Sequence, residues 1–276
     1  MNDFETRIID AETNCPVEQE NNHNSTEREQ HLLHNSKIVV VLLGAGISTS
    51  AGIPDFRSQN GLYAKYGGDL FHCLTLQHEP ERIHCFVHDY HSENYAPTKG
   101  HQVLKTLQDA GILRSVLTQN IDGLEEQVGL ERFKVVHLHG SLNEFRCTNH
   151  DCDGRLSGQE FKKFSTSRSM PLECYACNGS SLMRPEIVLF GEALNEAAIE
   201  YARLDLAACD TFICVGTSLK VQPVASMPMQ HVPQSAKRIW INRDPPPPHY
   251  ASFFTHQLLG DCDDMMQTLL PPAPPE

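Results

Sequence analysis

The 276-residue sequence has no apolar run near the ~20 residues that a membrane-spanning helix needs, so we expect no transmembrane segment and no membrane partner. Basic residues are also scarce, because 22 Lys and Arg stand against 35 Asp and Glu, for a net charge of −13. This balance argues against direct binding of nucleic acid through a basic face. The sequence also lacks a Lys/Arg cluster of the kind that directs nuclear import.

Both ends of the sequence lack the apolar residues needed to form a core. Residues 1–36 are rich in Asn, Glu, Gln and His, which predicts a disordered polar N-terminal segment without a signal peptide or a mitochondrial transit peptide. Residues 271–276 predict a loose, proline-rich tail. Ten cysteines without a secretory signal indicate a reducing, intracellular compartment, where clustered cysteines bind metal and scattered ones are buried.

The chain is organised around residues 37–57. Residues 38–43 form an unbroken apolar run, typical of a strand buried on both faces in a parallel sheet. Gly44 and Gly46 follow, where a chain leaving a strand turns tightly and lets a ligand approach its backbone. We expect the hydroxyl residues 48–50 to cap a helix that begins there. The third glycine of the dinucleotide fingerprint is missing, so a strand, turn and helix without a ligand is the alternative at this point.

Further apolar runs predict more strands, nearly all of which end in Gly, Ser/Thr, Asn or Asp. The carboxyl ends of parallel strands lie along one edge of a sheet, where ligands bind. Because several of these polar ends would lie side by side, they favour one shared site for a ligand with phosphates and ribose hydroxyls. A dinucleotide fits this description best, and Asn242 or Asp244 could hold one of its riboses. The runs are residues 115–118, 135–138, 211–215, 238–241 and 256–259.

This alternation of strands and helical segments predicts an α/β fold, a Rossmann-like parallel sheet with helices on both faces. Residues 58–98 are interrupted by Gly and Pro and fit short helices better than strands, which predicts a helical lid module.

Four cysteines form two close pairs, Cys147 with Cys152 and Cys174 with Cys177. Two such pairs separated by a short polar segment are typical of a structural tetrahedral zinc site, here in a ribbon module at about residues 146–183. With four ligands the ion would not activate water. The alternatives are two unrelated pairs of core cysteines, or His150 as a substitute for Cys152.

His139 is the candidate base among 15 histidines. It follows a buried strand, precedes a glycine that opens space beside it, and lies on the edge where a nucleotide would bind. A neutral imidazole there can take a proton from a ribose hydroxyl near neutral pH. We interpret His137, two residues earlier, as structural.

These motifs together resemble the sirtuin signature over about residues 37–265, in the order Gly-Ala-Gly-Ile-Ser (44–48), Thr-Gln-Asn-Ile-Asp (118–122), His-Gly (139–140), the two cysteine pairs, Arg-Pro-Glu-Ile-Val-Leu-Phe-Gly-Glu (184–192) and Gly-Thr-Ser-Leu (216–219). The looser details are similar to the subgroup that deacetylates histones. The resemblance implies a catalytic domain over residues 37–270, NAD consumed as a co-substrate, one structural zinc ion, and acetylated lysine proteins, with histones among them, as partners.

The resemblance also implies residue roles. His139 would be the general base, with Asn120 and Asp122 as further catalytic residues at the nicotinamide end. Residues 188–191 would pair with an extended substrate peptide by strand addition. The implied peptide set is Val188, Leu189, Phe190 and Gly191, and the implied metal set is Cys147, Cys152, Cys174 and Cys177. The implied NAD set is Gly44, Ala45, Gly46, Asp55, Phe56, Arg57, Gln119, Asn120, Ile121, Asp122, Gly216, Thr217, Ser218, Asn242 and Cys262.

Two departures from the family pattern bear on these roles. Four residues separate Cys147 from Cys152, where the family more often has two. Relatives that prefer acidic acyl groups carry a Tyr-x-x-Arg pair where Val87 and Tyr90 stand here. A carboxylate buried there would lack a cation, so we expect acetyl or a longer apolar acyl group.

Rival functions belong to other classes: a hydride-transferring oxidoreductase, a mono-ADP-ribosyltransferase or NAD hydrolase, and a catalytically silent zinc-ribbon scaffold. We expect a nuclear protein from the subgroup resemblance, with the cytoplasm as the alternative.

Overall fold

The predicted strands pair in one six-stranded parallel sheet with the order β3-β2-β1-β7-β8-β9. The computed structural model describes residues 32–56, 59, 61–167 and 171–270. The order reverses between β1 and β7, which is the switch point where open α/β sheets bind ligands. The strands are β1 (Val39–Leu43), β2 (Leu113–Thr118), β3 (Val135–His137), β7 (Thr211–Val215), β8 (Lys237–Asn242) and β9 (His256–Leu259).

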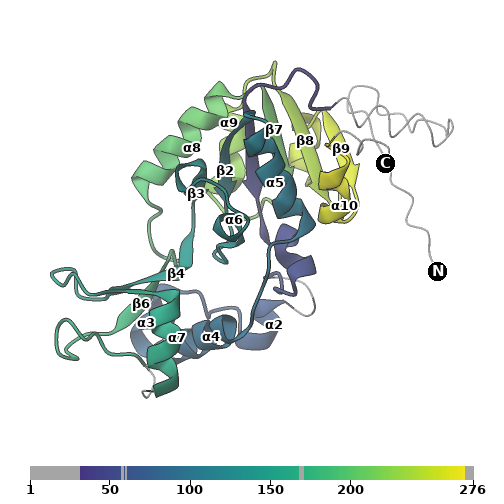
Figure 1. The fold of residues 1–276 in the computed structure, drawn as a ribbon. Helices are drawn as coiled ribbons and strands as arrows, with labels where there is room; N and C mark the ends of the chain where they lie inside the picture. The colour runs from purple at the N-terminus through teal and green to yellow at the C-terminus, as the bar shows by residue number, and fades with distance from the viewer. Residues whose placement is uncertain (1–31, 57–58, 60, 168–170, 271–276) are drawn as a thin grey trace, which may run out of the picture.

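Helices cover both faces of this sheet because successive residues of β1 point to opposite sides. Val39, Val41 and Leu43 enter one apolar core, whereas Val40 and Leu42 enter another. We call this part of the molecule the sheet body; it occupies the upper part of Figure 1. Its first core packs under α5 (Lys99–Asp109) and α10 (Cys262–Gln267), and its second under α8 (Glu196–Ala208), α9 (Met227–His231) and η4 (Pro248–Phe253).

A second, antiparallel sheet with the order β5-β4-β6 stands apart from the body, at the lower left of Figure 1. This sheet and four helices enclose one shared apolar core, and we call the whole the small lobe. The predicted fold class, a Rossmann-like sheet with a lobe of ribbon and helices, is therefore confirmed. The lobe contains α2 (Leu62–Tyr66), α3 (Cys73–His78), α4 (Pro80–Ser92), β4 (Gly140–Cys147), β5 (Arg155–Ser157), α7 (Gly158–Ser167) and β6 (Met183–Ile187).

Short helical turns connect several of these elements. They include the 3₁₀ helices η1 (Ala45–Ala51), η2 (Arg132–Lys134) and η3 (Val224–Ser226), and the one-turn helix α6 (Leu124–Gln127). None of the helices formed by the described residues combines the length and apolarity needed to cross a membrane.

The ordered chain begins before residue 37. Leu32 is buried in the first core of the body, and the Lys237 ammonium donates to its carbonyl (2.6 Å). Residues 32–36 were expected to belong to the disordered polar segment, and that part of the prediction is wrong because the apolar residues there find a place on the sheet. The remainder of that segment, residues 1–31, and the expected tail, residues 271–276, lie outside the described residues.

Candidate functional site

The loop after β1 meets the loop after β7 at the switch point. The backbone N–H of Gly46 donates to the carbonyl of Gly216 (2.8 Å). A Cβ atom on Gly44 would lie 2.5 Å from Thr217 Cβ, and one on Gly46 would lie 2.7 Å from Gly216 Cα. Only glycine fits at both positions, so the tight turn predicted from the sequence is required by the contact between the two loops.

The hydroxyl residues 48–50 do not cap a helix, and that prediction is wrong. The turn forms η1, whose N-cap makes no side-chain hydrogen bond. The Ser48 hydroxyl instead donates to Asp122 Oδ2 (2.8 Å), and the Ser50 hydroxyl donates to Asp263 Oδ2 (2.7 Å). These bonds tie η1 to the loop after β2 and to the start of α10.

The loop after β2 closes against the same turn. Gln119 Nε2 donates to Thr217 Oγ1 (3.1 Å), and Asn120 Nδ2 donates to the carbonyl of Gly44 (3.2 Å). Asn120 Oδ1 is buried and has no hydrogen-bond partner among the residues that the structure describes. Because buried polar atoms in folded proteins are nearly always paired, this oxygen indicates where a ligand donor would bind.

His139 lies between the sheet body and the small lobe, in the short link from β3 to β4. Its Nδ1 bonds to the carbonyl of Gln119 (3.0 Å). A carbonyl can only accept, so Nδ1 carries the proton and Nε2 of the neutral ring keeps a lone pair. Burial lowers the pKa of His139, and the bond to the Gln119 carbonyl offsets only part of that effect. Nε2 is buried without a partner in the described part of the chain, so it is poised as a neutral base.

His137 differs from His139 in its partner. Its Nε2 bonds to Glu126 Oε1 (2.5 Å). Burial lowers the pKa of His137, but the Glu126 carboxylate outweighs burial and leaves the pKa above its ordinary value. A histidine held in an ion pair on the body is a poor general base, in keeping with the structural role expected for it.

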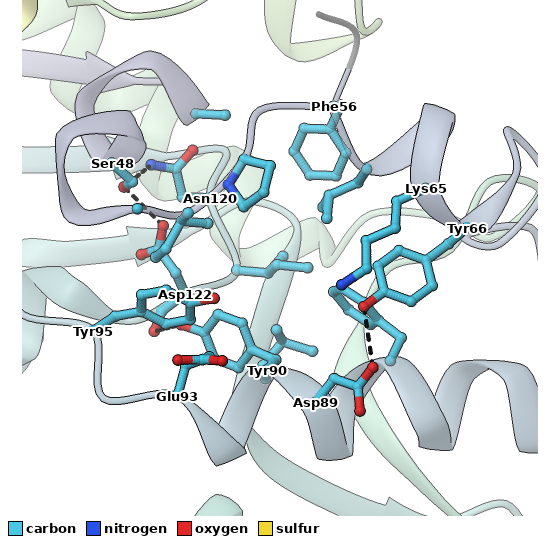
Figure 2. A pocket seen from close by; sticks show the side chains of 18 of the residues that line it. Ser48, Phe56, Lys65, Tyr66, Asp89, Tyr90, Glu93, Tyr95, Asn120 and Asp122 are labelled. Atoms are coloured by element: carbon cyan, nitrogen blue, oxygen red, sulfur yellow. Dashed lines mark hydrogen bonds between the residues drawn. The ribbon is translucent and has the colours of Figure 1, made fainter. Parts of the chain in front are cut away.

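A cavity of about 310 Å³ opens between the body and the lobe. Figure 2 shows Ser48, Asn120 and Asp122 on one side of it and Phe56, Lys65 and Tyr66 on the other. Predicted site residues therefore lie on both sides, because Phe56 also belongs to the implied NAD set, and residues of the lobe complete the second side. The lining residues from α2, α4, β4 and the segment after α4 that the sequence did not single out for this site are Leu62, Lys65, Tyr66, Phe86, Asp89, Ser92, Glu93, Tyr95 and Leu142.

Tyr90 joins the two walls of this cavity. Its hydroxyl donates to the backbone carbonyl of Asp122 (2.9 Å), and its ring lies 5.3 Å from that of Tyr95. The spacing of Phe86 and Tyr90, four residues apart on α4, was the signal in the sequence for one aromatic face. The sequence does not show that this aromatic face lines the cavity, because its orientation depends on how α4 packs in the lobe.

The remaining candidate NAD residues lie along the same sheet edge or beside the cavity. Asn242 Nδ2 donates to the carbonyl of Thr217 (3.5 Å), Ser218 is exposed, and Cys262 is buried at the start of α10. Ala45 and Ile121 line the cavity. The Asp55 carbonyl accepts from the backbone of α2, and Arg57 lies outside the described residues.

The segment expected to pair with a peptide already pairs within the chain. Val188 N donates to the carbonyl of His139 (2.9 Å), and Phe190 N donates to the carbonyl of Phe71 (2.7 Å). Leu189 N donates to Glu192 Oε2 (3.0 Å). Strand addition through these three donors would require them to exchange partners. The role of Val188, Leu189, Phe190 and Gly191 stays a prediction.

The four paired cysteines converge in the small lobe. All four sulfur atoms lie within 4.8 Å of one another, and His150 is not among them. The distances from Cys147 Sγ to Cys177 Sγ and from Cys152 Sγ to Cys174 Sγ are both 3.8 Å. Sulfur atoms about 2.3 Å from a tetrahedral zinc stand about 3.8 Å apart, so the donor set fits this metal.

Backbone donors support thiolate character at the first cysteine pair. Asn149 N donates to Cys147 Sγ (3.3 Å), and Gly154 N donates to Cys152 Sγ (3.4 Å). The wider spacing of this pair therefore does not remove Cys152 from the site. A complete tetrahedron of four sulfurs leaves no open position, which makes the site structural.

A Rossmann-like body joined to a cysteine-bearing lobe, with a neutral histidine at the junction, defines a class of dinucleotide-dependent proteins. Residues 44–223 match the family model described as the Sir2 family. The chain is 33% identical over 272 residues to "NAD-dependent protein deacetylase sir-2.1" of Caenorhabditis elegans, covering 95% of this chain and 43% of that protein. It is 36% identical over 213 residues to "NAD-dependent protein deacetylase" of Thermotoga maritima, covering 76% of this chain and 84% of that protein. The chain belongs to the Sir2, or sirtuin, family.

Solved structures agree with this assignment. The fold matches a structure described as "Structural Basis for the Mechanism and Regulation of Sir2 Enzymes" with a TM-score of 0.77 at 30% identity, covering 90% of this chain and 97% of that one. It also matches "Sir2-p53 peptide-NAD+" with a TM-score of 0.75 at 31% identity, covering 88% and 95%. The chain spans less than half the length of the Caenorhabditis elegans relative.

Proposed function

We propose that this protein is an NAD-dependent protein-lysine deacetylase, which transfers an acetyl group from lysine to ADP-ribose and releases nicotinamide. The observation that carries the proposal is His139. Its protonated Nδ1 is held by the Gln119 carbonyl, and its buried Nε2 has no partner among the described residues. The names of the Caenorhabditis and Thermotoga relatives support the same activity.

The residues present fit NAD as a co-substrate. The turn at Gly44 and Gly46 packs against the loop after β7 at the switch point of the sheet, and Ala45 between them lines the cavity. Asn120 Oδ1 is a buried acceptor without a partner in the described chain, suited to the amide of nicotinamide. When bound, NAD would supply a ribose carbon whose bond to nicotinamide breaks as the acetyl oxygen of the substrate attacks. Orientation of these groups must supply much of the rate, because an amide oxygen is a weak nucleophile.

In this proposal His139 acts as the general base. A proton from a ribose hydroxyl would pass to Nε2, and the Gln119 carbonyl would stabilise the positive ring through Nδ1. Phe56, which lines the cavity, would keep water from the reacting ribose. Asp122, fixed by the Ser48 hydroxyl, would hold the nicotinamide end.

Neutral acyl groups suit the cavity best. Tyr90 and the buried Val87 stand where relatives that prefer acidic acyl groups carry charged and hydroxyl partners. Lys65 does line the cavity, which the sequence did not reveal, but its ammonium lies over the Tyr66 ring at 4.7 Å. Asp89 and Glu93 line the same cavity, so its net charge disfavours a further carboxylate on the substrate.

Histones or other basic chromatin-associated proteins are the proposed substrates, and the nucleus is the proposed location, with the cytoplasm as the alternative. The net charge of −13 favours encounter with a lysine-rich tail. A relative from Candida albicans, 36% identical over 252 residues, is named "NAD-dependent histone deacetylase SIR2".

The test is to incubate the protein with NAD and an acetylated histone-tail peptide, and to follow nicotinamide and acetylated ADP-ribose by mass. We expect both products, and neither from the unacetylated peptide. Nicotinamide release at the same rate without an acyl peptide would favour an NAD hydrolase. NADH absorbance would favour an oxidoreductase. Equal rates on an acidic acetylated peptide would remove the histone preference while keeping the activity.

A further inference from the structure

Glu125, the second residue of α6, is a fully buried acid that the proposed reaction does not use. Its side chain is 0% exposed. Neither carboxyl oxygen makes a hydrogen bond of normal geometry with any residue that the structure describes. An ionised carboxylate in such a place would be costly, because burial without partners penalises the charged form.

Glu125 follows Asp122 by three residues at the start of α6, and it interacts electrostatically with the Asp122 carboxyl. The neighbouring Asp122 accepts from Leu124 N (3.1 Å) and from the Ser48 hydroxyl (2.8 Å). On the other side, the Thr118 hydroxyl accepts from Asn120 N (3.1 Å) and acts on the Glu125 carboxyl. The charge on Glu125 is therefore linked to both Asp122 and Asn120.

Other titratable groups around α6 are already accounted for. Glu126 pairs with His137 on β3. Tyr90 of α4 stays neutral, because burial raises its pKa and its hydroxyl donates to the Asp122 carbonyl. Burial raises the pKa of both carboxyls, and the Asp122 charge raises that of Glu125 further, so the pair disfavours a second negative charge. Asp122 receives two hydrogen bonds that favour its charged form, whereas Glu125 receives none of normal geometry from the described residues, so the shared proton belongs on Glu125.

We propose that Glu125 is a positioning residue that carries the single proton of the buried Asp122–Glu125 pair and so keeps Asp122 ionised and in place to bind the nicotinamide end of NAD. The inference rests on the proposed function. Burial raises the pKa of Glu125 to about 8, the Asp122 carboxylate adds to this effect, and the Thr118 hydroxyl opposes it. Above that pH, a second negative charge would displace Asp122.

The test compares NAD with ADP-ribose, which lacks nicotinamide, in calorimetric binding from pH 6 to pH 9.5. The wild-type protein should lose NAD affinity above pH 8, by up to about tenfold for each pH unit if the doubly ionised form does not bind. ADP-ribose affinity should not follow this curve. Glu125→Gln, which mimics the protonated acid, should remove the alkaline loss. The matched Glu126→Gln should keep it, because Glu126 pairs with His137.

A second readout does not depend on any variant. Infrared difference spectra of the wild-type protein should show the carbonyl stretch of a protonated carboxyl that disappears between pH 7 and pH 9. The inference is overturned if NAD binds with the same pH profile in the wild type and Glu125→Gln, or if that band is absent. If neither NAD nor ADP-ribose binds the wild type at any pH, the proposed function itself fails.

Discussion

The sheet body and the small lobe are stabilised in different ways. In the body, every residue of β1 and β7 is buried, and aliphatic side chains fill the first core, whereas the second core adds aromatic residues to them. The lobe has a three-stranded sheet and a core rich in aromatic residues, in which the rings of Phe145 and Phe161 stack at 4.2 Å. Four cysteines lie at one end of this core, close enough together to hold a zinc ion. Apolar burial alone accounts for the body, whereas the lobe combines apolar burial with a donor set for a metal.

The candidate site depends on both regions because the chain crosses between them at His139. β3 ends at His137 in the body, and β4 begins at Gly140 in the lobe. A Cβ atom on Gly140 would lie 1.9 Å from the Glu186 carbonyl of β6, so the crossing is tightly packed. A change in the lobe is therefore expected to reach the base, whereas the nucleotide loops lie wholly on the body.

The largest expected effect comes from removing the metal. Cys174→Ser should abolish zinc binding, expose the backbone of the lobe and stop turnover, because such sites contribute roughly 10–16 kcal/mol in small zinc modules. The strands of the body should stay protected. Metal content by mass spectrometry and amide hydrogen exchange, region by region, measure both results.

His150→Ala is the matched control, because His150 lies outside the cysteine cluster. It should keep one zinc per chain. Full zinc binding in Cys152→Ser together with its loss in His150→Ala would show that the histidine is the true fourth ligand.

A cavity created in the sheet body should have the reverse effect: it should destabilise the body and leave the zinc site intact. Leu42→Ala removes a side chain that is 1% exposed, and it should cost about 2–5 kcal/mol of unfolding free energy. Zinc content should not change. Leu204→Ala, at a residue 50% exposed on α8, should stay within about 0.5 kcal/mol. Urea denaturation of both variants measures the difference, and equal losses would contradict the packing described for the body.

At low pH we expect the sheet body and the small lobe to lose stability in the same way, because each contains a buried histidine. In the body, burial lowers the pKa of His101 to about 4, and its Nδ1 accepts from the Thr98 backbone (3.2 Å). In the lobe, burial also lowers the pKa of His84, whose Nδ1 accepts from Leu172 N (3.0 Å). A folded-state pKa below the unfolded one means that stability falls as pH drops below about 6.5.

His101→Gln measures the contribution of the body. Glutamine can accept from the same backbone N–H at this helix position but does not titrate. Protonation of His101 should lower the unfolding free energy of the wild-type protein by about 2 kcal/mol between pH 7 and pH 5. The variant should not show this part of the decrease. Parallel pH curves in urea denaturation would contradict the assignment.

The body was more predictable from sequence than the lobe. The apolar run at residues 211–215 coincides with β7, because a strand buried on both faces leaves an unbroken pattern. The strand expected at residues 256–259 coincides with β9, although its first two residues are polar. The spacing of the cysteines predicted their convergence. The lobe wall of the cavity, with Lys65 and Tyr90, was not predictable, since short helices carry little periodicity and their orientation comes from packing.

The hydroxyl groups of the site show a second limit of the sequence. Ser48 resembles a helix cap but hydrogen-bonds to Asp122, which lies 74 residues further along the chain. A contact of this kind follows from the sheet order and cannot be deduced from local pattern. Glu125 is similar, because an acid near a helix start normally faces solvent, and only the fold reveals that it is buried.

Turnover and NAD affinity of His139→Ala and His137→Ala, measured side by side, test the central claim most directly. His139→Ala should bind NAD with nearly the wild-type affinity, because the nucleotide loops lie on the body, and its deacetylation rate should fall by about 10²–10⁴-fold. His137→Ala should lose stability along with its Glu126 pair but keep most of its turnover. A His139→Ala protein that deacetylates at the wild-type rate, or a folded but inactive His137→Ala protein, would contradict the account.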